Sequence, residues 1–355
     1  MNLDAIAGHA RVRAFLKNAL RDGSVSHAYL FVGPTGVGKT ATALAFAADL
    51  LEAAAVAPGS AVHPDLWVED SATETIGVDL LRRDRGARSG PDPEAEAGVP
   101  AQPLQAFLSL KGMYSDRRVA VVARAQRLTD PAASALLKTI EEPPEGAVLV
   151  LCAEAAELLP PTIRSRCQEL EFGRLADPDV TAFLTAQGEA ATPELLRLAR
   201  GCPGVALRLA RDPDEQSRRA GWTGALAAVL DGSWIEIVGL GARFGTGDAA
   251  RNRGLAREAL DAWEWWLRDV AAARVEGTAA GDAAADGIDI ADLLRLWESA
   301  REAADRVENN VNPRLAIEVF LADVQALRRD GAVPAPFAAG VGGGLGRRAT
   351  SRRLG

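Results

Sequence analysis

Short apolar runs alternate with helical patterns along the first half of the chain. The strand-like runs are residues 28–32, 66–68, 118–123, 147–152 and 168–172. Between the third and fourth runs, an Ala- and Leu-rich stretch at residues 131–142 stops at Pro143-Pro144, as helices do before proline. Strands that alternate with helices predict an α/β domain with a mostly parallel sheet covered on both faces.

The pattern becomes helical after residue 172. Residues 192–211 form a short helical pattern interrupted at residues 201–204, and a longer helical array begins near residue 214. Apolar residues in this array recur at alternating steps of four and three, which places them on one helix face. They are Ala256, Leu260, Trp263, Leu267 and Val270, and the neighbouring Trp265 and Trp266 are also expected to pack in the core.

Asn312 and Pro313 predict the start of the last helix, as its N-cap and its first-turn proline. This helix carries Leu315, Val319 and Leu327. We therefore expect the second half of the chain to be a helical domain that packs on itself or on neighbouring subunits.

Two segments follow neither pattern. Residues 83–101 are rich in Gly, Pro and charge, which predicts a disordered insertion rather than a functional loop. Residues 331–355 combine a Gly-rich stretch with four arginines, which predicts a solvated tail, with nucleic-acid contact as the alternative. These arginines are Arg347, Arg348, Arg352 and Arg353.

Composition narrows the function classes. A net charge of −8 and a pI of about 5.2 argue against a stand-alone nucleic-acid binder, because long-range repulsion opposes the contact. No apolar run approaches the ~18 residues of a membrane span. The first ten residues lack the profile of a signal peptide, so the expected compartment is the cytoplasm.

Cysteine and histidine are too sparse for a metal or disulfide prediction. Cys152, Cys167 and Cys202 are widely spaced and form no CxxC pair. The three histidines are equally scattered. We predict no metal site in the protein itself.

A phosphate-binding loop follows the first strand-like run. The motif G-x-x-x-x-G-K-[ST] is complete between a strand and a helix, which is the context that it requires. Its backbone N–H groups are expected to face the phosphates of ATP, with Lys39 at the β- and γ-phosphates and Thr40 on Mg²⁺. The motif consists of Gly33, Pro34, Thr35, Gly36, Val37, Gly38, Lys39 and Thr40.

The acids needed for hydrolysis are missing after the third run. Ala123 and Arg124 occupy the positions where an Mg²⁺-holding acid and a water-polarising glutamate belong. Alanine cannot hold a metal-bound water, and arginine cannot act as a base at neutral pH because its pKa exceeds ~12. Asp116 and Asp130 flank the strand at unsuitable positions. We therefore expect that the chain can bind ATP but is not an active ATPase on its own.

Several motifs, spread over residues 3–330, resemble the AAA+ clamp-loader subunits of bacterial DNA polymerase III, and most of all their delta-prime type. The two most specific are the segment ALLKTIEEPP at residues 135–144 and the segment IRSRC at residues 163–167. Residues 6–9, 26–31, 63–66 and 310–316 add to the resemblance.

The resemblance implies an organisation for the whole chain. Residues 1–173 correspond to an AAA+ P-loop NTPase core with a parallel sheet, and residues 174–213 to a small helical lid. Residues 214–330 correspond to a C-terminal helical collar, followed by the tail at residues 331–355. Relatives with a four-cysteine zinc module carry it where residues 51–62 have no cysteine, so zinc is not predicted.

The resemblance also assigns roles. Arg166 corresponds to an arginine finger that projects into the ATP site of the adjacent subunit. Ala123 and Arg124 stand where active motor subunits are acidic, and residues 152–154 replace their polar sensor residue. Gly204 stands where motors carry a sensor arginine, although the nearby Arg208 could substitute in part.

The leading hypothesis is a delta-prime-like stator in a pentameric loader that places a sliding clamp on primed DNA. Its expected partners are gamma/tau-type and delta-type subunits, the clamp and, through the complex, DNA, within a nucleoid-associated replisome and away from membranes. The alternative is a gamma/tau-like ATPase motor that hydrolyses ATP with unconventional acids. An unrelated P-loop enzyme such as a nucleotide kinase is disfavoured, because the two specific motifs would then be coincidences.

Overall fold

The computed structural model describes most of the chain. The described residues are 2–52, 63–71, 75–82, 100, 102–231, 239–245, 248–275, 288–308 and 311–330. Two predicted segments lie outside them: the insertion at residues 83–101, except residue 100, and the tail at residues 331–355. Among the described helices, none is both long and apolar enough to cross a membrane.

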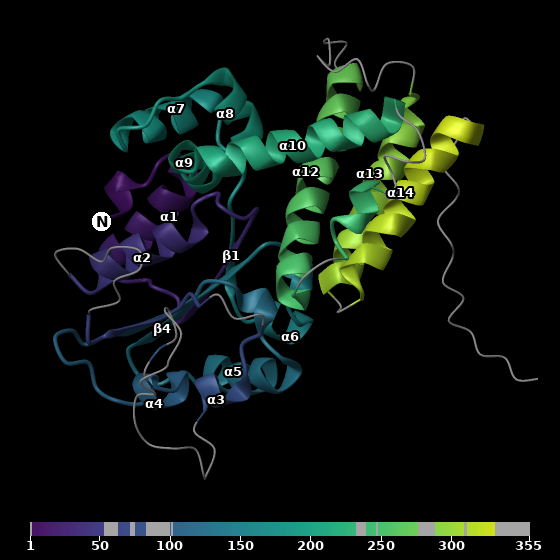
Figure 1. Ribbon diagram of the computed structural model, residues 1–355. Helices are drawn as coiled ribbons and strands as arrows, with labels where there is room; N and C mark the ends of the chain where they lie inside the picture. Colours follow the sequence, from purple (N-terminus) through teal and green to yellow (C-terminus); the bar gives the residue numbers. More distant parts are fainter. Residues whose placement is uncertain are drawn as a thin grey trace, which may run out of the picture. The chain divides into compact units, whose positions relative to one another are not determined.

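A five-stranded parallel sheet lies at the centre of the first half of the chain (Figure 1). Its strand order is β2-β3-β4-β1-β5, so β1 lies between β4 and β5. All four strand pairs are parallel, which confirms the predicted fold class. The strands are β1 (Ala28–Val32), β2 (Leu66–Glu69), β3 (Arg118–Val122), β4 (Ala147–Ala153) and β5 (Gln168–Glu171).

Helices cover both faces of the sheet because successive side chains of a strand point to opposite faces. Tyr29 and Phe31 of β1 pack in one core with residues of α1 (Ala10–Arg21) and α2 (Lys39–Leu50). Ala28 and Leu30 pack in a second core on the other face. That second core includes residues of α3 (Val78–Leu81), α4 (Leu104–Leu108) and α5 (Asp130–Glu141).

Three short helices after the sheet have a hydrophobic core of their own. They are α7 (Asp177–Ala186), α8 (Pro193–Ala199) and α9 (Pro203–Arg211). Val180, Leu184, Leu195 and Leu209 are buried between them. Thr192 caps α8 by accepting a hydrogen bond of 3.1 Å from the N–H of Leu195. A further short helix, α6 (Pro161–Arg164), precedes β5.

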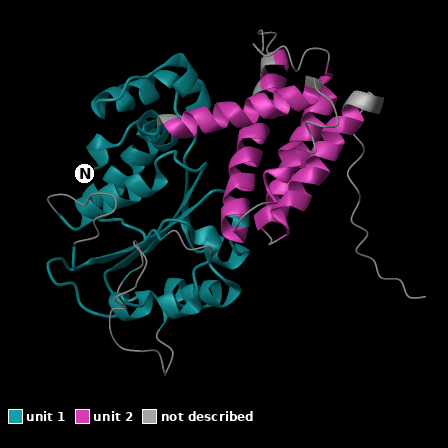
Figure 2. Ribbon diagram, in the orientation of Figure 1, with its two compact units in different colours: residues 1–212 teal, residues 213–355 magenta. Residues whose placement is uncertain are grey.

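The chain divides into two compact units, residues 1–212 and residues 213–355 (Figure 2). The second unit contains α10 (Pro213–Asp231), α12 (Ala249–Val275), α13 (Ile290–Glu308) and α14 (Pro313–Asp330). Trp263 is fully buried at its centre, 5.3 Å from the ring of Phe320, and its indole N–H donates to the carbonyl oxygen of Trp222 at 2.8 Å. The apolar face predicted for α12 is buried as expected, and Trp265 is partly buried against it.

The last helix begins where it was predicted, and two of the three apolar residues named on it face outward. Asn312 caps α14 by accepting a hydrogen bond of 3.0 Å from the N–H of Arg314. Leu327 is buried, whereas Leu315 is 54% exposed and Val319 is 39% exposed. Leu315 and Val319 therefore do not pack in the core of this unit, which the expectation of packing on itself or on neighbouring subunits allows. The core face is one position further on, at Ala316, Ile317, Phe320, Leu321 and Val324.

Candidate functional site

The phosphate-binding loop connects the carboxyl end of β1 to the first turn of α2. Gly36 and Gly38 have φ angles of 77° and 117°, a region that residues with side chains rarely adopt. A side chain at Gly33 would also collide with its surroundings, because a Cβ there would lie 2.3 Å from the carbonyl oxygen of Phe172. The three glycines are thus required by backbone geometry, and the motif has the strand–loop–helix arrangement of an anion site.

The side chain of Lys39 folds back and bonds to the backbone of its own loop. Its ammonium group donates to the carbonyl oxygens of Gly33 at 2.6 Å and Pro34 at 2.9 Å. The residue is only 7% exposed, and this burial lowers the pKa of Lys39. To hold a phosphate, Lys39 has to exchange these two carbonyl acceptors for phosphate oxygens. The side chain is therefore already near the place where the motif needs it.

His9 supports the loop from the N-terminal segment. Its Nε2 lies 2.9 Å from the carbonyl oxygen of Val37, and because a carbonyl can only accept, Nε2 carries the proton. The imidazole packs on Phe172 with ring centroids 4.8 Å apart. Burial lowers the pKa of His9. The sequence placed His9 in a segment that carries the family resemblance and gave no metal role to it, but it did not predict this contact.

The first turn of α9 lies directly on the loop. The N–H of Gly204 donates to the carbonyl oxygen of Gly36 at 2.8 Å. A Cβ at Gly204 would lie 2.9 Å from that oxygen, and a Cβ at Gly36 would lie 2.7 Å from Cγ2 of Val205. Neither position has room for a side chain in this arrangement. Arg208, the suggested substitute for a sensor arginine, is exposed on the same helix.

Glu154 is an acid beside the loop that sequence reasoning did not use. It follows β4, which pairs with β1 in the sheet, and its Oε1 accepts a hydrogen bond of 2.8 Å from the hydroxyl of Thr35. Gln126 donates to the same oxygen at 3.3 Å. Glu154 could have been found from its position after a strand, because the carboxyl ends of neighbouring parallel strands meet at one edge of a sheet. Two residues earlier, burial raises the pKa of Cys152 to about 12, so its thiol stays neutral.

The end of β3 carries no acid. Ala123 is 6% exposed, and its N–H donates to the carbonyl oxygen of Glu69 at 2.8 Å. Arg124 pairs with Asp70 at 3.3 Å and donates to the carbonyl oxygen of Ser71. Ala123 is thus bonded to the last residue of β2, and Arg124 to the segment that follows β2. The residues of the loop suit the phosphates of a nucleotide, but this strand end offers neither a ligand for Mg²⁺ nor a base for water.

Arg166 lies in the turn between α6 and β5. Its Nη1 donates to the carbonyl oxygen of Thr162 at 3.0 Å and to the hydroxyl of Ser165 at 3.3 Å. Its Nη2 pairs with Glu141 at 2.8 Å. The side chain is 40% exposed. Within the described part of the chain, these contacts are to residues outside the phosphate-binding loop, so the structure does not bring Arg166 to the loop of its own chain.

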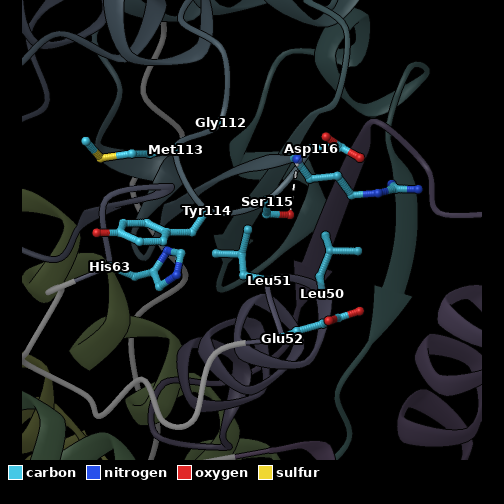
Figure 3. A pocket seen from close by; sticks show the side chains of 10 residues that line it. Leu50, Leu51, Glu52, His63, Gly112, Met113, Tyr114, Ser115 and Asp116 are labelled. Carbon is cyan, nitrogen blue, oxygen red and sulfur yellow. Dashed lines mark hydrogen bonds between the residues drawn. The ribbon is translucent and has the colours of Figure 1, made fainter.

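A cavity of about 790 Å³ lies at the opposite edge of the sheet (Figure 3). It is lined by the end of α2 and by the loop that precedes β3, and it includes Leu51, His63 and Tyr114. Because the strands are parallel, the amino end of β3 is remote from the loop that follows β1. This cavity is therefore separate from the candidate phosphate site. Among the described residues, no group of three or more His, Cys, Asp or Glu could hold a metal ion.

Comparisons with known proteins agree with the motifs. Residues 99–176 match the family model described as DNA polymerase III, delta subunit. The chain is 33% identical over 209 residues to DNA polymerase III subunit delta' of Pseudomonas aeruginosa, which covers 52% of this chain and 56% of that protein. It is 31% identical over 211 residues to subunit gamma/tau of Mycobacterium tuberculosis, which covers 56% of this chain and 34% of that protein.

The chain thus spans about a third of the gamma/tau relative and about half of the delta' relative. A solved gamma subunit-related protein of Thermotoga maritima is 18% identical and covers 88% of this chain and 99% of its own, with a TM-score of 0.47. The resemblance inferred from the motifs is confirmed, although similar identities to both kinds of subunit do not separate them. By sequence, this chain is similar to the delta' and gamma/tau subunits of bacterial DNA polymerase III.

Proposed function

We propose that this chain is a delta'-like stator of a clamp loader, which supplies Arg166 to the ATP site of a neighbouring subunit and does not hydrolyse ATP itself. The observation that carries the proposal is the end of β3. Ala123 is buried there, and Arg124 is paired with Asp70 where an ATPase needs two acids. A chain without those acids contributes to hydrolysis through another subunit's site.

Nucleotide binding remains part of the proposal. Gly36, Gly38 and Lys39 have the backbone geometry and the charge that phosphates require. ATP would be held by the loop N–H groups and Lys39, with Thr40 as the available hydroxyl for Mg²⁺. Because Ala123 cannot complete the metal site, ATP would act here as a structural ligand.

Arg166 suits a role in trans. Its guanidinium is partly exposed, and its contacts within the chain are with surface groups rather than with the loop that would bind this chain's own nucleotide. A guanidinium placed against a γ-phosphate stabilises the charge that develops in phosphoryl transfer. The proposed partners are gamma/tau-type and delta-type subunits, a sliding clamp and, through the complex, primed DNA, with the helical unit at residues 213–330 joining the subunits as a collar.

ATP turnover by the purified chain tests the proposal. We expect ATP to bind, Lys39→Ala to abolish that binding, and the hydrolysis rate of the unmodified chain to equal that of Lys39→Ala. A gamma/tau-type subunit from the same genome serves as the active control. If the chain alone hydrolysed ATP at the rate of that control and Lys39→Ala removed the activity, the stator function would be wrong.

One observation favours a second candidate function, a gamma/tau-like motor. Glu154 lies beside the loop, where its carboxylate accepts a hydrogen bond from Thr35. Its negative charge raises the pKa of Lys39, against the larger lowering by burial. In this function, the acid that follows β4 takes the place of the acids missing from β3. The motor function predicts ATP turnover by the isolated chain that Glu154→Gln abolishes while ATP binding persists, whereas the stator function predicts no turnover to abolish.

A further inference from the structure

The two most specific motifs of the sequence meet in space. Glu141 belongs to the segment ALLKTIEEPP, and Arg166 belongs to the segment IRSRC. Oε1 of Glu141 lies 2.8 Å from Nη2 of Arg166, which is the distance of a charge-assisted hydrogen bond. Glu141 ends α5, Arg166 follows α6, and these two helices are in contact.

Glu141 lies at the carboxyl end of a helix, where a carboxylate is unfavourable unless a cation is paired with it. It is the last residue of α5, which is 12 residues long and stops before Pro143-Pro144. The carbonyl groups at this end of a helix carry partial negative charge and repel an acid. Glu142 is also a glutamate and lies next to it, yet the ion pair with Arg166 is made by Glu141. The pair thus stabilises the end of α5 and directs one particular carboxylate at the guanidinium.

Three acceptors fix the plane of the guanidinium of Arg166. Nη1 is held by Thr162 of the short helix α6 and by Ser165, its C-cap, and Nη2 is held by Glu141 from α5. A planar fork that is bound on both terminal nitrogens by two separate elements has little rotational freedom left. The side chains of Arg166 and Glu141 are nevertheless 40% and 43% exposed, so another molecule can reach them.

We infer that Glu141 is a positioning residue for Arg166, which holds the guanidinium in the orientation that it needs in the neighbouring ATP site. The inference rests on the proposed function, because it concerns the finger that this function assigns. Glu141 acts through Arg166 and touches no substrate. Orientation matters because phosphoryl transfer depends on the placement of charge around the phosphate, and a small displacement lowers the rate.

The test is a double-mutant cycle in the complex reconstituted with the gamma/tau-type and delta-type subunits of the same genome. Glu141→Ala is expected to lower the kcat of the adjoining ATP site about 3- to 10-fold, since a loosened guanidinium still samples the working orientation. The KM for ATP and the assembly of the complex should stay unchanged. Glu141→Gln should retain most of the activity, because its amide oxygen still accepts a hydrogen bond from Nη2. In the Arg166→Ala background, Glu141→Ala should have no further effect.

Glu142→Ala is the matched control, since it removes the adjacent exposed acid without touching Arg166, and it should behave as the unmodified chain. If Arg166→Ala left the ATPase unchanged, the proposed function would fail and not only this inference. If Arg166→Ala lowered the rate while Glu141→Ala left the rate unchanged or raised it, the positioning role would be wrong. It would also be wrong if Glu142→Ala caused the same loss, or if Glu141→Ala disrupted assembly.

Discussion

The N–H of Gly204 lies 2.8 Å from the carbonyl oxygen of Gly36, so the first turn of α9 is bonded to the tip of the phosphate-binding loop. The two glycines are 168 residues apart in the sequence, counted from their numbers. Neither has room for a Cβ on the side that faces the other element. Packing against the loop thus explains why a glycine stands at position 204.

Gly204→Ala is expected to destabilise the protein. The new Cβ would lie 2.9 Å from a backbone oxygen, so α9 has to move away from the loop. We expect a loss of about 1–3 kcal/mol in the free energy of unfolding, as is usual for overpacking. Thermal unfolding measured by circular dichroism, with hydrogen exchange at residues 203–211, gives the readout.

Gly224→Ala is the matched control within α10, because a Cβ there meets nothing within 4 Å. This change should stabilise its helix by about 0.5–1 kcal/mol, since alanine loses less conformational entropy than glycine. Equal effects of the two substitutions would contradict the packing explanation for Gly204.

Asp65 is expected to be essential for the loop that precedes β3. Its carboxylate is fully buried and accepts the N–H groups of Met113 at 2.6 Å, Tyr114 at 2.7 Å and Ser115 at 3.2 Å, with Arg118 at 3.6 Å. Asp65→Asn replaces one acceptor oxygen by a donor and should cost about 1–3 kcal/mol of unfolding free energy. Chemical denaturation at pH 7 measures it, and a loss as small as that of the exposed control Asp116→Asn would contradict this role.

The same carboxylate predicts an acid dependence. Burial raises the pKa of Asp65, but the three backbone hydrogen bonds and Arg118 outweigh it, and the pKa is lowered from 3.8. A folded-state pKa below the unfolded value means that the stabilisation is complete above pH 3.8 and is lost as the pH falls through the folded-state value. The difference in unfolding free energy between the unmodified chain and Asp65→Asn should therefore shrink in that range.

His9 predicts a dependence at higher pH. Burial lowers its pKa from 6.5, so the folded protein holds the neutral imidazole. The stability contributed by His9 is complete above pH 6.5 and decreases as the pH falls from there towards the folded-state pKa. Unfolding free energies at pH 7.5 and 5.5 should differ less for His9→Asn than for the unmodified chain. Asparagine is chosen because it tolerates the left-handed backbone at this position, where φ is 48°. Parallel pH profiles would show that His9 is not the group responsible.

Much of the fold could be predicted from the sequence, since hydrophobic period and proline positions determine the elements. The strands and α5 were predicted to within one residue or so, because apolar runs and Pro143-Pro144 mark their ends. The face of α14 that is buried within the unit could not be predicted, because the helical spacing of Leu315 and Val319 fits packing within the unit and packing on a neighbouring subunit equally well.

The candidate site was predictable only where a motif encodes it. The phosphate-binding loop and the alanine and arginine after β3 could be identified by spacing alone. Glu154, His9 and Glu141 could not, because each acts through a residue that is distant in sequence, at Thr35, Val37 and Arg166. Strand order and helix packing create these contacts, and the local hydrophobic pattern of a sequence determines neither of them.

The most direct test of the stator function is the ATPase rate of the reconstituted complex with Arg166→Ala. Arg21→Ala is the control, since Arg21 is also an exposed arginine paired with an acid, Asp22 at 2.9 Å. Loss of a finger lowers turnover at the site that it completes by about 10³-fold or more. We predict that Arg166→Ala removes the contribution of the adjoining site while ATP binding by this chain and assembly persist, and that Arg21→Ala changes nothing. Equal rates for the Arg166→Ala and unmodified complexes would contradict the account.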